Sequence, residues 1–174
     1  MSDPKIIKQA FERNKKAVEL RPQIGQKTVT TKVRLVEGTT CEVIHPEWTF
    51  KADIGKSEGG NDAGPGPGIL QRGALGACLA IGYVQQAAVL GVPIEHIEVT
   101  VEAKKDFRGR LGIDDRPPGS QELKYNVLIE SSATEDKINK VIEEADRISP
   151  VLDDFRRAIL ITREIKIMAG KTAG

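Results

Sequence analysis

The spacing of hydrophobic positions changes several times along the chain, and each change marks a predicted element. In the first twenty residues apolar side chains recur on one helical face, with Ser2 as the expected N-cap and Pro4 in the first turn. This pattern predicts an N-terminal helix that ends at Arg21. From Lys27 onward the pattern alternates and Val and Thr are frequent, which predicts two or three antiparallel strands, with a turn at Glu37-Gly38.

A segment without apolar periodicity, Gly55 to Gly68, is rich in turn-forming residues and predicts a surface loop. The uncharged stretch that follows, Gly73 to Ile94, is long enough to cross a bilayer as a helix. However, Gln85 and Gln86 interrupt it, Gly and Ala dominate it, and Gly91-Val92-Pro93 stops a helix. We therefore interpret it as a buried helix of a globular core and expect no membrane span.

The second half of the chain predicts a hairpin, an amphipathic helix and a last strand. Alternating patterns over residues 96–107 and 122–131 predict paired strands joined by an exposed loop. Residues 131–148 repeat apolar positions at helical spacing behind Ser or Thr caps, residues 151–157 favour a short helix, and residues 158–167 favour a strand. Because strands come in antiparallel groups instead of alternating with helices, the predicted fold class is α+β.

Composition narrows the function classes. The 174 residues suit a single domain, and 26 Lys and Arg against 25 Asp and Glu give a net charge of +1, so no global field would attract a nucleic acid. Two cysteines, Cys41 and Cys78, are too few for a secreted disulfide scaffold, and the N-terminus has no apolar signal segment. We expect a cytoplasmic protein.

The sequence gives little support for a nucleotide-binding site or a metal site. The glycine-rich loop lacks the Lys-Ser or Lys-Thr of a phosphate-binding loop, so no nucleotide cofactor is expected. His45 and His96 have no partners at metal-ligand spacing, so no metal is expected either. Cys78 is the remaining candidate, because small residues surround it on the predicted central helix; the alternative is that it is one more small buried side chain.

The passage GGNDAGPGPGILQRGALGACLA, residues 59–80, resembles the signature of the OsmC/Ohr superfamily, and the order of predicted elements fits from about Thr28 to Met168. The resemblance implies an OsmC-like α+β fold, with antiparallel sheets wrapped around two central helices in an interwoven, cytoplasmic homodimer. Residues 1–24 would then be an N-terminal helical extension and residues 25–174 the OsmC-like domain.

The same resemblance implies that Cys78 is a peroxidatic thiolate and that an arginine from the first hairpin, here Arg34, assists it. The chain departs from the family pattern at three positions: Arg34 lies two residues from the place expected for that arginine, Ser149 replaces the second, resolving cysteine, and Gly68 replaces an activating carboxylate. Cys41 could resolve only if its Cα lay within about 7 Å of that of Cys78.

Two hypotheses remain open at this point, and the sequence does not decide whether the protein is an enzyme. One is a one-cysteine, thiol-dependent hydroperoxide reductase of oxidative stress defence, with an organic hydroperoxide as substrate and an external thiol as reductant. The other is a non-catalytic OsmC-fold protein that binds a small apolar or thiol ligand at the dimer interface, where Trp48, Phe50 and Tyr83 are candidate walls. A dimeric α+β binding domain of another family is the third alternative.

Overall fold

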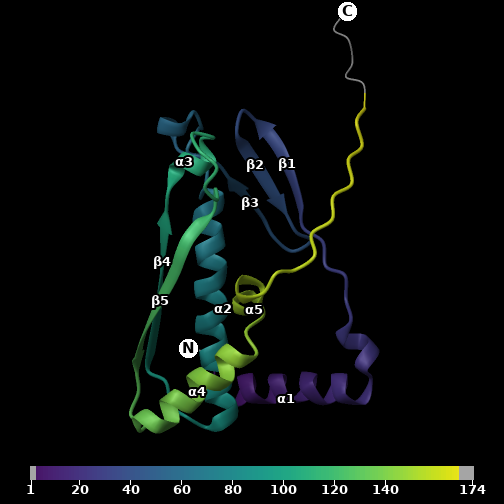
Figure 1. Ribbon diagram of the computed structural model, residues 1–174. Helices are drawn as coiled ribbons and strands as arrows, with labels where there is room; N and C mark the ends of the chain where they lie inside the picture. Colours follow the sequence, from purple (N-terminus) through teal and green to yellow (C-terminus); the bar gives the residue numbers. More distant parts are fainter. Residues whose placement is uncertain (1–2, 169–174) are drawn as a thin grey trace, which may run out of the picture.

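The computed structural model describes residues 3–168, and its fold class is α+β, as predicted. The elements follow one another in this order: α1 (Pro4–Leu20), a 3-10 turn (Pro22–Gly25), β1 (Lys32–Glu37), β2 (Thr40–Ile44), β3 (Thr49–Ala52), a 3-10 turn (Lys56–Glu58), α2 (Pro67–Leu90), β4 (His96–Lys105), α3 (Phe107–Arg110), β5 (Ser120–Glu130), α4 (Glu135–Arg147) and α5 (Pro150–Arg156). Figure 1 shows the long helix α2 standing between the β4–β5 hairpin and the β1–β3 sheet.

The N-cap of the first helix lies one residue later in the chain than expected. Asp3 is the N-cap, and its carboxylate accepts a 2.9 Å hydrogen bond from the Lys5 N–H, so the prediction of Ser2 as cap is wrong. Helix α1 lies crosswise against the C-terminal half of α2 (Figure 1), where Lys8 Nζ donates to the Val89 carbonyl at 3.1 Å.

Two separate antiparallel sheets form. The first has the order β1-β2-β3, with Arg34 opposite Glu42 and Cys41 opposite Ala52, and its first turn places Gly38 at φ +54°, in the region that favours glycine. The second is the β4–β5 hairpin, whose alternate positions are partly buried toward α2. Both agree with the predicted strands.

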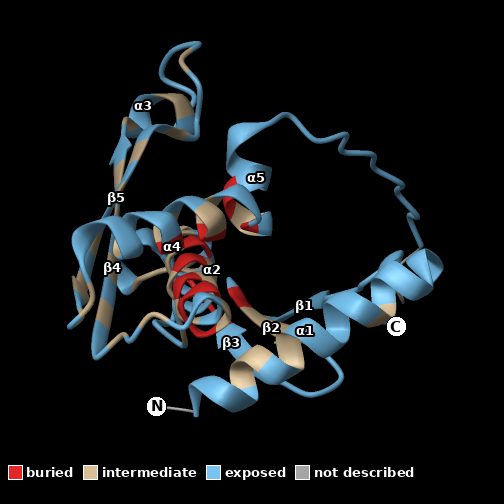
Figure 2. Cartoon of the chain, turned by 90° about the horizontal axis from the view of Figure 1, so that it is seen from below, coloured by how far each residue is buried: buried red, intermediate tan, exposed pale blue. Residues whose placement is uncertain are grey.

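The core is built around α2 and two shorter helices. Figure 2 shows buried residues concentrated in α2, α4 and α5, whereas α1 and the first sheet are largely exposed. The fully or nearly buried apolar set is Ala52, Leu75, Leu79, Tyr83, Ala87, Ala88, Val141, Ala145 and Leu152. Within residues 3–168, α2 is the one helix whose length and hydropathy would suit a bilayer, but here it packs against α1, α4, α5 and β4, as the core helix of a globular domain does.

Helix α2 is longer at its start than its uncharged stretch. It begins at Pro67, which suits the first helical position because it needs no N–H there, and ends before Gly91 at φ +68°. Gln71 and Arg72 lie in its second turn. The uncharged stretch, from which the helix was predicted, therefore leaves out the first turns of the helix.

The glycine-rich loop before α2 is organised by one buried carboxylate, that of Asp53. Its oxygens accept hydrogen bonds from the hydroxyls of Thr39 (2.7 Å) and Thr40 (2.8 Å) and from three backbone N–H groups, those of Ile54, Asn61 and Ala63. These bonds, the Thr39 hydroxyl first, hold the pKa of Asp53 far below its usual value even though burial opposes this. The loop is thereby tied to the first sheet.

The predicted last strand is not formed within one chain. Residues 157–168 run away from the other elements in an extended path (Figure 1) and have no strand partner. A strand requires a neighbour for its N–H and C=O groups, and within the described chain this segment pairs with neither sheet. Its apolar side chains are left exposed, Leu160 and Ile167 at about nine-tenths.

Candidate functional site

Cys78 lies in the middle of α2, half buried, where α2 passes the junction between α4 and α5. Its Sγ is 3.3 Å from the Oγ of Ser149, either of which can donate the hydrogen. Ser149 is buried and is the N-cap residue of α5. The structure thus brings together the two positions that the resemblance paired, as a thiol and a hydroxyl.

The junction that carries Ser149 is fixed by a second polar contact. Asp146, near the end of α4, accepts hydrogen bonds from the hydroxyls of Tyr83 and Tyr125, both at 2.8 Å. Burial, and then the bond to Asp146, raise the pKa of Tyr83 well above its usual value, and the same causes raise the pKa of Tyr125. Because Asp146 is three residues before Ser149, these bonds hold the serine against α2.

Sequence reasoning missed Asp146. The 3.6-residue period places it beside Val141, Ile142 and Ala145, and it is the polar residue at the edge of that apolar face. A carboxylate in that place signals a partner on a neighbouring element, but the sequence does not say which.

Arg34 and Cys41 lie on the first sheet, away from that junction. Arg34 is exposed on β1 and pairs with Glu42 across the strands, with Nη2 2.8 Å from Oε2. Cys41 is half buried on β2, and its Sγ is 3.8 Å from the Thr39 carbonyl. Both cysteines are free thiols. Among residues 3–168 no hydrogen bond joins Arg34 or Cys41 to Cys78, so their roles stay predictions.

Gly68, the position of the missing carboxylate, is in the first turn of α2. Two cations face it, Lys105 from the end of β4 and Arg72 from the next turn of α2. The sequence alone did not indicate either of them, because they are 33 residues apart and meet only through the packing of β4 on α2.

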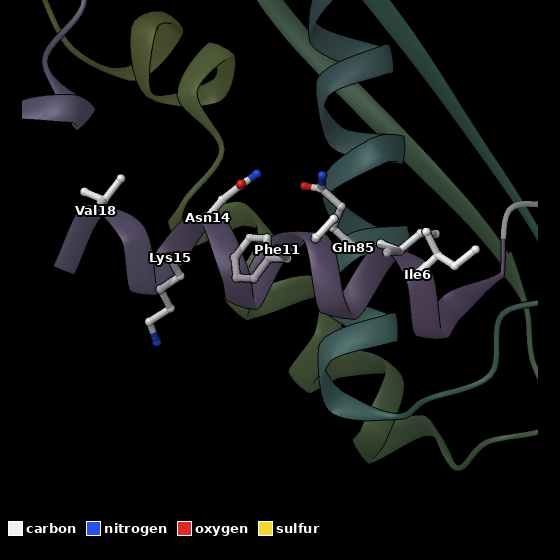
Figure 3. Close-up of a pocket in the computed structure, with 8 residues that line it drawn as sticks. Ile6, Phe11, Asn14, Lys15, Val18 and Gln85 are labelled. Carbon is white, nitrogen blue, oxygen red and sulfur yellow. The ribbon is translucent and has the colours of Figure 1, made fainter. Parts of the chain in front are cut away.

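The three aromatic residues predicted as walls of a ligand pocket differ in their exposure to solvent. Tyr83 is completely buried, whereas Trp48 and Phe50 are exposed at the end of the first sheet and free to contact a ligand or another chain. A separate hollow of about 660 Å³ lies where α1 crosses α2; Figure 3 shows Ile6, Phe11 and Val18 of α1 along it, with Gln85 of α2 beside them. It is lined mainly by α1, and its lining does not include Cys78 or Ser149.

Side chains that could hold a metal ion do not cluster in the described part of the chain: no group of three His, Cys, Asp or Glu is suitably placed.

Comparison with known proteins gives a consistent result. A family model described as OsmC-like protein matches residues 59–164, more than half of the chain. No curated protein sequence matches significantly.

Several solved structures share the fold at low sequence identity. An OsmC-like protein from Mycoplasma pneumoniae has a TM-score of 0.65 at 18% identity, over 75% of this chain and 89% of that one. A protein from Aquifex aeolicus has a TM-score of 0.60 at 12% identity, over 75% and 89%. An organic hydroperoxide resistance protein OsmC from Legionella pneumophila has a TM-score of 0.51 at 15% identity, over 75% and 92%. At these identities the likeness establishes the fold.

Proposed function

The chain belongs to the OsmC-like protein family, and from that premise we propose that it is a one-cysteine hydroperoxide reductase in which Cys78 reacts with an organic hydroperoxide. The observation that carries the proposal is the contact between Cys78 Sγ and Ser149 Oγ at 3.3 Å. It places a half-buried thiol beside a buried hydroxyl that can donate a hydrogen bond to sulfur.

The reaction has two stages. The Cys78 thiolate attacks the distal oxygen of ROOH, the O–O bond breaks, and the alkoxide takes up a proton and leaves as ROH, so that sulfur is oxidised to a sulfenic acid. An external dithiol then attacks that sulfur, releases water and forms a mixed disulfide. The second thiol of the reductant attacks this mixed disulfide and displaces the Cys78 thiolate. The reductant, which has donated two electrons, leaves as a cyclic disulfide.

Ser149 cannot act as a resolving residue. A hydroxyl cannot form a disulfide, so residue 149 cannot convert the sulfenic acid into one, and the proposed reductant is a thiol from solution. The Ser149 hydroxyl can instead donate a hydrogen bond to the thiolate or to the sulfenate oxygen, and such bonds to charged acceptors are stronger than neutral ones.

We also propose that the working form is a homodimer. The chain has 13631 Å² of accessible surface, whereas a compact monomer of this mass has roughly 8400 Å². Residues of α1, of β1 and of the segment 157–168 are mostly exposed, in agreement with this excess. In that last segment Ile159, Ile161, Ile165 and Ile167 occupy alternate positions, with Arg163 between them on the same face, which is the pattern of a strand with one mainly apolar face. A second copy of the chain is a suitable partner for it.

A dimer would also complete the Cys78 site. Arg34 is exposed on β1 of the first sheet, so a partner's sheet could bring an arginine to Cys78 from outside the subunit. Two free thiols are consistent with a reducing, cytoplasmic location.

The test is hydroperoxide consumption with excess dithiol. Cumene hydroperoxide is followed with the natural chain, with Cys78→Ser and with Cys41→Ser as the matched control. The proposal expects turnover that Cys78→Ser abolishes and Cys41→Ser retains. Consumption at the dithiol background would contradict it.

The second candidate is a binding protein without peroxidase activity. It is favoured by one observation: among the described residues Cys78 Sγ has a hydroxyl, and no cation, as its hydrogen-bonding neighbour. An activated thiolate usually lies beside a positive charge. If the hydroperoxide test fails, binding of small apolar thiols to the dimer becomes the hypothesis to measure.

A further inference from the structure

A cavity of about 910 Å³ lies at the start of α2, apart from Cys78. It is bounded by the loop after Asp53, the first turns of α2, the end of β4 and the short helix α3. None of the chemistry proposed for Cys78 uses it.

Two cations converge on the one position in its wall that has no side chain. A Cβ placed on Gly68 would lie 2.9 Å from Lys105 Nζ and 3.5 Å from Arg72 Nη1. The two positive groups therefore occupy the edge of the space that any side chain at position 68 would enter. Two like charges that face the same small space repel each other, so this arrangement favours an anion between them.

The other charged residues of the cavity are Asp53, Glu58, Asp62 and Arg110, and among the described residues none of the three carboxylates forms an ion pair with Lys105 or Arg72. Arg110 is already paired with Glu58, at 2.9 Å. The Asp53 carboxylate is occupied by its hydroxyl and backbone donors, and Asp62 directs its Oδ1 toward Gly55. Over residues 3–168 neither Lys105 nor Arg72 forms an ion pair or a side-chain hydrogen bond.

An apolar groove continues from the same place. A second hollow of about 310 Å³ shares Ile69 and Arg72 with the cavity and runs along α2 past Gly73 and Gly76, with Val101 of β4 on its other side. The glycines leave room beside the helix, but this room is narrow, because a Cβ on Gly76 would already lie 3.4 Å from Val101 Cγ2. A ligand lying in it would be narrow and apolar.

We infer that Lys105 and Arg72 bind the carboxylate or phosphate group of a small molecule over Gly68, with the apolar part of that molecule in the groove along Gly73 and Gly76. The start of a long helix adds a partial positive charge at the same point. Cys78 is ten residues further along α2, about 15 Å along the helix axis, and contacts Ser149 of the α4–α5 junction and not β4. The site thus goes beyond the proposed peroxidase chemistry and does not depend on it.

The test is anion binding followed at the site. The full chain, labelled with ¹⁵N, is titrated at constant ionic strength with inorganic phosphate, acetate and hexanoate, and the amide resonances of Gly68 and Ile69 are followed. The inference expects saturable shifts with phosphate or with the carboxylates, and tighter binding of hexanoate than of acetate if carboxylate is the group recognised. Phosphate binding alone would assign the site to phosphate esters. Unchanged Gly68 and Ile69 resonances with all three probes would overturn it.

Single substitutions distinguish a specific anion site from general attraction of anions to positive charge on the protein surface. Lys105→Gln and Arg72→Gln are each expected to weaken binding about tenfold, the usual effect of losing one charge-assisted hydrogen bond. Lys104→Gln is the matched control, since its side chain points to the other face of β4, and it should leave the affinity unchanged. Gly68→Asp supplies an internal carboxylate and should abolish binding while the protein stays folded. An equal effect of Lys104→Gln and Lys105→Gln would contradict the inference.

The outcome is independent of the peroxidase proposal. Cys78→Ser should bind the anion as the natural chain does, so loss of peroxidase activity and loss of anion binding are distinguishable.

Discussion

Cys78 and Ser149 are 71 residues apart in the chain and 3.3 Å apart at their side-chain tips. The contact joins the middle of α2 to the cap of α5, with Ser149 buried. It defines both what the site can do, which is to support a thiolate or sulfenate by hydrogen bonding, and what it cannot do, which is to close a disulfide.

Replacing Ser149 by cysteine should restore an intramolecular disulfide. An S–S bond of about 2.05 Å requires only a small approach from the present contact. In Ser149→Cys, one equivalent of hydroperoxide should produce a disulfide between Cys78 and the introduced thiol in place of a sulfenic acid, seen by peptide mass mapping without reduction. Ser132→Cys, at an exposed position, is the control and should leave Cys78 unbridged. A persistent sulfenic acid on Cys78 in Ser149→Cys would mean that the side chains are further apart than the structure has them.

The tie between α4 and the core predicts a stability effect. Asp146→Ala removes the acceptor of two tyrosine hydroxyls, one of them on the completely buried Tyr83. Leaving both without a partner should lower the free energy of unfolding by about 3 kcal/mol, measured by urea denaturation. Asp153→Ala is the comparison, because its ion pair with Arg157 is exposed and such pairs contribute little. Equal losses in the two variants would contradict the role given to Asp146.

The Asp53 carboxylate predicts a dependence of stability on acid. Its pKa is lowered in the folded chain by the Thr39 hydroxyl and the other donors, so ionised Asp53 stabilises the fold above its unfolded pKa of about 4 and this contribution is lost as pH falls. Asp53→Asn should therefore be less stable than the natural chain at pH 7, and the difference should shrink between pH 4 and pH 2. Thermal unfolding across that range measures it. A constant difference from pH 7 to pH 2 would rule out the charge as the cause.

The exposed C-terminal segment predicts a test of the dimer. Ile161 belongs to its apolar alternate face, and Thr162 points to the opposite face. Ile161→Glu should convert a dimer of twice 19.0 kDa into monomers, as measured by light scattering after gel filtration, whereas Thr162→Glu should not. A natural chain that is monomeric at micromolar concentration would refute the dimer.

The local elements could be predicted from the sequence because their signals are local. Gly91 ends α2, Gly38 supplies the turn between β1 and β2, and alternation marks β4 and β5, whereas the start of α2 at Pro67 falls inside the predicted loop. The predicted last strand failed for the opposite reason. Its alternating pattern is present, but a strand needs a partner, and within residues 3–168 it pairs with neither sheet.

The candidate site likewise contains residues that could be identified from the sequence and contacts that could not. The family resemblance identified Cys78, Ser149 and Gly68 as related positions, and the structure adds that Ser149 directly contacts Cys78. The bonds of Asp146 to Tyr83 and Tyr125, and the convergence of Lys105 and Arg72, depend on how separate elements pack. No spacing within one helix or strand encodes them.

The most direct measurement of the central claim is the product of a single reaction at Cys78. The reduced protein is mixed with one equivalent of tert-butyl hydroperoxide without any dithiol, and intact and peptide masses are recorded while the alcohol released is quantified. The account predicts one added oxygen atom on Cys78, one tert-butanol per oxidised site, and neither in Cys78→Ser. Oxidation at Cys41 instead, or hydroperoxide left unconsumed, would contradict it.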